Sequence, residues 1–338
     1  MKILVNCNLP FALAHGGMQT QIEQTQRALQ SIGVEVEPLR WWDSTQRGDV
    51  IHYFGRIPTV HIELAHQKGI KVVISELLGT TGARSRAKLW LQRRIIWTMQ
   101  RTLPPSMLFV YHWRSYPLAD ACIALTPWEA HLLSHLFGAR PETVHVIPNG
   151  VEEVFLNSQP ANRGTWLVCT ATITKVKRVV EVAEAAIQAQ TPIWIIGRPF
   201  AESDPYAREF LALAARHPQF VRYDGPVQDR QQLAQIYREA RGFILLSAWE
   251  SLSLSALEAA ACDCPLLLSD LPWARSTFQE HANYCPIAPP GRTAGYLRKF
   301  YDLAPSLKPP PKPLTWTEVA RQLERIYRSV LESPKISR

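Results

Sequence analysis

The chain has 338 residues, a length that suits two domains of about 150 residues each. Its hydrophobic fraction of 46% is typical of a globular protein, and no run of about 18 or more apolar residues predicts a membrane-spanning helix. The net charge of +8 favours anionic partners: nucleotide phosphates, acidic lipids or nucleic acid. Nucleic acid is the weakest of the three, because zinc-finger spacings and RNA-recognition motifs are absent from the sequence.

Segments that read as strands and helices alternate along the chain, which predicts α/β layers around parallel sheets. In the first half, short apolar runs predict strands at residues 2–6, 34–36, 50–53, 72–75, 122–125 and 144–147. Helices are predicted at residues 18–32, ended by Gly33, and from Thr126 to Phe137. The N-terminus enters the first strand directly and lacks the apolar core of a signal peptide.

The second half repeats the same alternation. Strands are predicted at residues 166–170, 193–196, 221–223, 243–247 and 266–269. Helices are predicted at residues 179–190, 230–240 and 253–263, and at 315–331 after a proline-rich link. Neither half carries a Gly-x-Gly-x-x-Gly motif after its first strand, which argues against a dehydrogenase.

Six cysteines are scattered along the chain, most of them in apolar, strand-like context. This distribution is typical of buried free thiols in a reducing cytoplasm, so we expect a cytoplasmic protein. Cys262 and Cys264 are too isolated for a zinc site, which needs four ligands at suitable spacing. We therefore expect no metal and no other cofactor.

Glu250 and Glu258 are the most informative residues of the chain. Glu250 lies in a predicted strand-to-helix loop, and Glu258 lies in the second turn of the helix that follows. The backbone amides around Leu252, Ser253 and Leu254 begin this helix, and such a start attracts phosphate. A phosphate site flanked by carboxylates suits a sugar nucleotide, whose hydroxyls donate to the carboxylates. The spacing alone fits equally well a solvated helix with two ordinary surface glutamates.

The segment from Glu250 to Asp270 resembles the Glu-x7-Glu signature of the retaining glycosyltransferases of family 4, together with the E-A-x-A-C-G-x-P run that follows it there. Further segments similar to family motifs lie in the family's order at residues 119–126, 146–151, 195–197 and 223–240. This order makes the resemblance specific, and it covers nearly the whole chain. The chain departs from the family at Leu252-Ser253, where Phe-Gly is usual, and at Thr172, where an arginine is usual.

The resemblance implies the GT-B fold, an α/β architecture of two Rossmann-like domains that face each other across a cleft. An acceptor-side domain is expected at residues 1–155 and a nucleotide-sugar-binding domain at residues 156–313. A helix at residues 314–338 is expected to cross back and pack on the first domain.

The resemblance also implies a function. The chain is expected to move a hexose from a nucleotide-diphospho-sugar to a cell-surface glycan, a lipid or a small molecule, with retention and without a metal ion. Three alternatives stay open: an epimerase that acts on sugar nucleotides, an inverting transferase, and a degenerate scaffold that binds sugar nucleotides or partner transferases without catalysis.

The site residues follow from the same resemblance. Glu250 is expected to hold the sugar hydroxyls and to act in catalysis with Lys177, which neutralises the diphosphate, while Glu258 binds the ribose. Further donor contacts are expected from Gly16, Gly17, Thr172, Lys175, Arg178, Arg198, Leu252, Ser253 and Leu254. A physical argument supports the cations: the positive end of a helix disfavours lysine and arginine unless an anion is present, and three of them precede the helix at residues 179–190.

The acceptor side offers two candidate polar residues, Glu76 and His112. His52 matches a family position that also carries histidine, and a lone histidine in a strand is expected to be structural.

Basic and large apolar residues interleave at helical spacing between Arg84 and Arg101. This pattern fits a helix that lies on an anionic membrane surface. It fits equally an acceptor-side surface or a partly buried helix with a solvated basic face. Peripheral attachment to the inner face of a membrane is therefore one of three alternatives for this segment.

Overall fold

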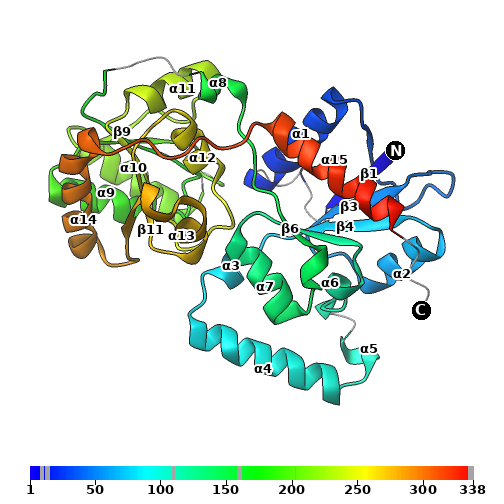
Figure 1. Cartoon of the computed structure of the whole chain (residues 1–338). Helices are drawn as coiled ribbons and strands as arrows, with labels where there is room; N and C mark the ends of the chain where they lie inside the picture. The colour runs from blue at the N-terminus through cyan, green and yellow to red at the C-terminus, as the bar shows by residue number, and fades with distance from the viewer. Residues whose placement is uncertain (8–10, 12–15, 109–110, 158–161, 202, 334–338) are drawn as a thin grey trace. The chain divides into compact units, whose positions relative to one another are not determined.

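The structure, a computed structural model, describes residues 1–7, 11, 16–108, 111–157, 162–201 and 203–333. The chain divides into two compact units (Figure 1). Unit 1 comprises Met1–Asn149 and Trp316–Arg338, and unit 2 comprises Gly150–Thr315. The chain therefore leaves unit 1 once, builds unit 2, and returns to unit 1 with its last helix.

Unit 1 contains, within its described residues, a parallel sheet of six strands in the order β2-β1-β3-β4-β5-β6. The strands are β1 (Lys2–Cys7), β2 (Glu35–Pro38), β3 (Val50–Phe54), β4 (Lys71–Ser75), β5 (Ala121–Ala124) and β6 (Val144–Val146). Each lies within two residues of a strand predicted from the sequence. Every residue of the central β3 is buried, as expected for a parallel sheet that is covered on both faces.

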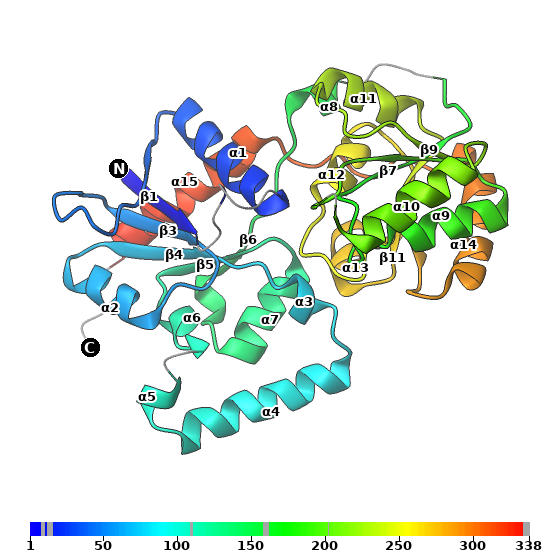
Figure 2. The same ribbon diagram turned by 180° about the vertical axis from the view of Figure 1, so that it is seen from behind.

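The helices of unit 1 cover both faces of this sheet (Figure 2). They are α1 (Gly17–Ser31), α2 (Thr59–Gln67), α3 (Gly79–Gly82), α4 (Arg86–Thr102), α5 (Pro105–Leu108), α6 (Ser115–Leu118), α7 (Pro127–Phe137) and α15 (Trp316–Glu332). A short 3₁₀ turn, Pro141–Thr143, precedes β6. The sequence predicted α1, α7 and α15 but not α2.

A buried histidine ties the last helix to the sheet of unit 1. His52 in β3 is fully buried, and its Nδ1 lies 2.6 Å from the hydroxyl of Tyr327 in α15. Its Nε2 lies 2.7 Å from the hydroxyl of Ser75, at the end of β4. The prediction of a structural histidine is confirmed, and α15 also packs against α1.

Unit 2 contains, in the part of the chain that the structure describes, a second parallel sheet of six strands in the order β12-β11-β10-β7-β8-β9. The strands are β7 (Leu167–Thr170), β8 (Ile193–Ile196), β9 (Val221–Tyr223), β10 (Gly242–Leu245), β11 (Leu266–Ser269) and β12 (Asn283–Cys285). The chain proceeds outward from β7 to β9 and then resumes on the other side of β7 with β10. Ligands of open α/β sheets bind where the strand order reverses in this way, at the carboxyl ends of the strands.

The helices of unit 2 pack on its sheet. They are α8 (Glu153–Leu156), α9 (Val179–Ala189), α10 (Pro205–Arg216), α11 (Arg230–Glu239), α12 (Leu254–Ala261), α13 (Pro272–Phe278) and α14 (Pro290–Leu303). The sequence predicted α9, α11 and α12 and all strands but one. It missed β12, a three-residue edge strand that is too short to show a period.

The loops after β7 and β8 are held together at the carboxyl edge of this sheet. Ile173 and Pro199 form a β-bridge, and the Ile173 amide donates to the carbonyl of Arg198 at 3.0 Å. Gly197 makes this contact possible: its φ is +152°, and a Cβ there would lie 1.9 Å from the carbonyl oxygen of Ala171. No side chain fits between the two loops.

We predict that Gly197→Ala lowers the free energy of unfolding by about 3 kcal/mol, because the new methyl group forces two backbone segments apart. Gly295→Ala is the control: this glycine lies within α14, a Cβ there meets nothing within 4 Å, and the change should stabilise by up to about 1 kcal/mol. Urea unfolding of both variants tests this. Equal stability of the two variants would contradict the close approach at Gly197.

A second prediction concerns pH. Burial lowers the pKa of His52 from 6.5 to about 3. The unfolded chain therefore takes up a proton at a pH where the folded chain does not, and the contribution of His52 is complete above pH 6.5 and is lost as the pH falls towards 3. His52→Asn should lower stability at pH 7.5 and remove up to about 1.4 kcal/mol per pH unit from the acid slope.

Urea unfolding between about pH 7.5 and 4.5 measures this slope. The control is His281→Asn, at an exposed histidine of unit 2, which should leave the slope unchanged. An unchanged slope in His52→Asn would mean that His52 is protonated in the folded protein.

Candidate functional site

Lys177 and Glu250 meet at the point where the strand order of unit 2 reverses. Lys177 lies in the loop after β7 and Glu250 in the loop after β10, the strand beside β7. The Lys177 ammonium donates a hydrogen bond to Glu250 Oε1 and forms an ion pair with it. The two loops are also joined by a hydrogen bond of 2.7 Å from the Ala248 amide to the Val176 carbonyl. The structure thus brings together the two residues that the sequence predicted as catalytic.

The helices that follow these loops begin at the same edge of the sheet. α12 begins at Leu254, and the hydroxyl of Ser253 caps it by accepting from the Ala256 amide at 3.2 Å. Three residues were predicted to contact the donor here. The side chain of Leu252 is buried, and that of Ser253 caps the helix. Leu254 provides a backbone amide in the first turn. The positive end of α12 therefore lies at the same edge of the sheet as the Lys177–Glu250 pair.

Glu258 lies at the centre of a buried network. Its Oε1 accepts a hydrogen bond from Nη2 of Arg230, and its Oε2 accepts one from the Tyr237 hydroxyl at 3.3 Å. Arg230 also donates from Nε to Glu152 at 2.8 Å. Burial raises the pKa of Glu258, and the guanidinium of Arg230 opposes this shift. Each carboxylate oxygen of Glu258 keeps a second lone pair for another donor.

Arg230 is the functional residue that the sequence analysis missed. It is the first residue of α11, directly after the capping residue Asp229. An arginine at a helix start is unfavourable unless an anion accompanies it, and here two carboxylates do. The same argument that singled out the cations before α9 would have found Arg230.

The other basic residues predicted to bind the donor differ in their exposure. Arg178 is buried, its φ is +55°, and its Nη2 donates to the Ala288 carbonyl at 2.5 Å. The position of Arg178 differs from the one expected of a phosphate ligand, because the left-handed turn directs its guanidinium into the interior of unit 2. Lys175 is exposed, as is Arg198 on the loop bridged to it. Thr172 is partly exposed in the same loop as Lys175 and brings no charge.

The two glycines predicted to contact the donor belong to unit 1. Gly17 begins α1, and Gly16 precedes it with extended backbone at φ 165°. A Cβ at either position would meet nothing within 4 Å, so packing within unit 1 does not demand glycine there.

Glu76, the first acceptor-side candidate, follows β4 and lies in a second buried network. Its Oε2 accepts a hydrogen bond of 2.5 Å from the hydroxyl of Tyr116, which is fully buried. The Tyr116 hydroxyl accepts in turn from Nε of Arg56 at 2.6 Å, and that nitrogen lies 3.7 Å from Glu76. Burial raises the pKa of Glu76, while Tyr116 and Arg56 lower it.

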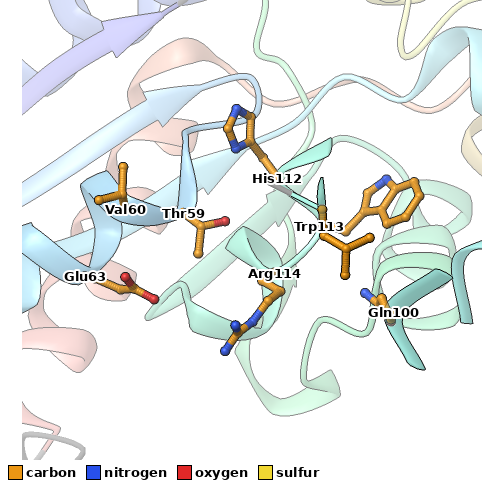
Figure 3. A pocket seen from close by; sticks show the side chains of 8 residues that line it. Thr59, Val60, Glu63, Gln100, His112, Trp113 and Arg114 are labelled. Atoms are coloured by element: carbon orange, nitrogen blue, oxygen red, sulfur yellow. The ribbon is translucent and has the colours of Figure 1, made fainter. Parts of the chain in front are cut away.

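His112, the second acceptor-side candidate, lines a pocket of about 260 Å³ in unit 1. Figure 3 shows residues of α2 on one side of this pocket and Gln100 of α4 on the other, with His112 and Arg114 between them. Burial lowers the pKa of His112, and the charges of Arg56 and His61 lower it further. Arg56 therefore acts electrostatically on both acceptor-side candidates, Glu76 and His112.

The described residues lack two kinds of feature. No three His, Cys, Asp or Glu side chains gather there as metal ligands do. No described helix combines the length and the apolarity that crossing a bilayer requires.

Two protein-family models match the chain. "Glycosyltransferase Family 4" matches residues 37–154 in unit 1, and "Glycosyl transferases group 1" matches residues 165–304 in unit 2. Together they cover about three quarters of the sequence, in the order that the resemblance implied. The chain belongs to this glycosyltransferase family. The family named from the sequence motifs is therefore confirmed.

A curated relative supports the family. The D-inositol 3-phosphate glycosyltransferase of Jonesia denitrificans is 34% identical over 179 residues, which are 45% of this chain and 41% of that protein. The match thus spans less than half the length of the relative.

Solved structures share the fold of this glycosyltransferase-family chain. A sucrose-phosphate synthase from Thermosynechococcus elongatus superposes with a TM-score of 0.67 at 17% identity and covers 97% of this chain and 98% of its own. Anabaena HepE, solved in complex with UDP and glucose, has a TM-score of 0.63 at 12% identity, with coverage of 97% and 99%. The predicted GT-B fold is confirmed.

The network around Glu258 generates a prediction about stability. Arg230→Met should lower the free energy of unfolding by about 2 kcal/mol, since Glu258 then stays buried without its cation. The partial exposure of Arg230 keeps the loss below that of a fully buried pair. The double variant Arg230→Met/Glu258→Gln should recover part of the lost free energy of unfolding, because the amide of Gln carries no charge that needs a partner.

Urea unfolding at pH 7 compares these variants with Arg208→Met, an exposed arginine of α10 that should behave like the unchanged protein. Equal losses in the single and double variants would show that Glu258 does not depend on the charge of Arg230.

Proposed function

We propose that this chain transfers a hexose from a nucleotide-diphospho-sugar to an acceptor, which is a cell-surface glycan, a lipid or a small molecule. The observation that carries the proposal is the contact between Lys177 and Glu250 at the strand-order reversal of unit 2. This contact supports the proposal, because an ammonium suited to a diphosphate lies beside a carboxylate suited to sugar hydroxyls, at the edge where sheets of this kind bind nucleotides. Family membership supports the reaction class, and HepE binds UDP and glucose.

The diphosphate would lie against Lys177 and the first turns of α9 and α12. As the bond from the sugar C1 to the phosphate oxygen breaks, its electron pair passes to the departing diphosphate. The acceptor oxygen bonds to C1 on the same face, and its proton goes to the departing phosphate. Lys177 and the helix amides stabilise the charge that grows on this phosphate, a contribution of about 3–4 kcal/mol for a single well-placed donor.

Glu250 neutralises Lys177 in the structure. A diphosphate carries more charge than one carboxylate, so it competes for the ammonium and frees a Glu250 oxygen for a sugar hydroxyl. Glu258 is held by Arg230 and Tyr237 in one orientation and has lone pairs left for the ribose. Arg230 thus acts as a positioning residue for Glu258.

The finer parts of the proposal rest on the same residues. Retention follows from the resemblance to the Glu-x7-Glu family. Transfer without a metal ion is supported by Lys177 and by the exposed cations Lys175 and Arg198, which compensate for the neutral Thr172. The acceptor would bind on unit 1 near Glu76 and His112. A cytoplasmic location fits the six cysteines, which all lie within the described residues and form no disulfide there.

We predict that Lys177→Met weakens the binding of nucleoside diphosphates roughly tenfold or more, the equivalent of one charge-assisted hydrogen bond. Calorimetric titration of UDP, GDP and their sugars identifies the base and measures the loss. The matched control is Lys299→Met, an exposed lysine of α14, which should leave affinity unchanged. Equal affinities of the two variants would overturn the placement of the diphosphate.

Glu250→Gln should bind the nucleoside diphosphate with nearly unchanged affinity but lose most donor hydrolysis and transfer. Activity that persists in EDTA supports the metal-free reaction, and the anomer of the product, assigned by NMR, tests retention. Donor binding without hydrolysis or transfer, over a panel of acceptors, would establish the scaffold alternative instead.

A further inference from the structure

Helix α4 of unit 1 carries a concentration of positive charge that the proposed transfer reaction does not use. Residues 84–101 contain six arginines and lysines and no acidic residue, in a chain whose net charge is +8. On α4, spacing of three or four residues aligns the side chains of one stripe, Arg86, Trp90, Arg93, Arg94, Trp97 and Arg101. We call these six residues the α4 stripe.

The inward side of α4 is made by other residues. Leu89 and Ile96 are buried and belong to the hydrophobic core of unit 1. α4 packs against α7, and Figures 1 and 2 both show it beyond α7, on the side away from the sheet. Fixing α4 to unit 1 therefore requires Leu89 and Ile96 but none of the side chains of the α4 stripe.

The outward side holds large apolar side chains in solvent. Trp90 is 61% exposed and Trp97 is 48% exposed, and the aliphatic Leu91 and Ile95 are about as exposed beside them. Arg94 lies over the rings of both tryptophans at 5.6 and 5.9 Å, and Arg101 lies over Trp97 at 3.8 Å. Exposed apolar surface of this extent marks an interaction site.

We infer that the α4 stripe docks this protein on a bilayer surface with anionic headgroups. Tryptophan prefers the depth where headgroups meet acyl chains, and arginine reaches from there to the phosphates. The 17-residue helix, about 25 Å long, lies flat on such a surface. A soluble polyanion would satisfy the arginines and stack on the tryptophans, but it would leave Leu91 and Ile95 in water. Because a bilayer surface also covers these two aliphatic side chains, they favour lipid over a soluble polyanion.

This docking does not depend on the proposed transfer reaction, because it uses neither donor nor acceptor. The test is flotation of the full chain with vesicles of phosphatidylcholine alone and of phosphatidylcholine with phosphatidylglycerol. Binding is expected to the anionic vesicles only and to weaken as salt rises from about 0.1 to 0.5 M. Arg94→Gln/Arg101→Gln should weaken it roughly thirtyfold, and Trp90→Ala roughly tenfold.

Matched controls exist for both changes. Trp42→Ala removes a tryptophan of unit 1 that is 85% exposed, and Arg292→Gln/Lys299→Gln removes two exposed charges from α14. Both controls should bind vesicles like the unchanged protein, and circular dichroism of every variant tests whether it is folded.

Three results would overturn the inference: no flotation with anionic vesicles, equal binding to neutral and anionic vesicles, or equal losses in the stripe variants and their controls. Binding of RNA or heparin that depends on the α4 stripe, without vesicle binding, would assign the stripe to a soluble polyanion.

Discussion

The ion pair between Lys177 and Glu250 is the interaction on which the site of unit 2 depends. It joins the loops of two adjacent parallel strands at the place where the chain changes direction across the sheet. The backbone contact between Ala248 and Val176 supports it, so the two loops hold each other in place. A preorganised charge costs little reorganisation during a reaction, and a sugar nucleotide would meet its cation and its carboxylate already in register.

Neighbouring residues of one turn have opposite roles at this site. Lys177 extends to the open edge of the sheet, while Arg178 turns into the interior and binds the carbonyl of Ala288. The left-handed backbone at Arg178 separates the two. Glu258 is similarly withdrawn, because Arg230 and Tyr237 hold it below the surface. Of the charged residues expected at this edge, Arg178 and Glu258 are therefore buried, whereas Lys175 and Arg198 are exposed.

Most strands could be predicted from apolar runs, which are local signals. The fold class and the presence of Lys177 and Glu250 at one site could be predicted from the order of family motifs, but their direct ion pair could not. The direction of the Arg178 side chain could not, since it depends on one backbone angle and on a carbonyl 110 residues away. The position of Arg230 at a helix start could have been used, but its partners Glu152 and Glu258 could not be predicted, because they lie 78 and 28 residues away in the sequence. The short edge strand β12 offers three residues and no periodicity.

Unit 2 is an insertion into unit 1, and the two ends of the insertion are bonded to each other. Val151 and Thr315 form a parallel bridge, and the Val151 amide donates to the Leu314 carbonyl at 2.8 Å. The segment therefore begins and ends at one place, and its excision would leave neighbouring termini rather than a gap across the domain. Such an arrangement makes residues 150–315 a natural module for exchange between related chains, with the rest of the protein serving as an uninterrupted host.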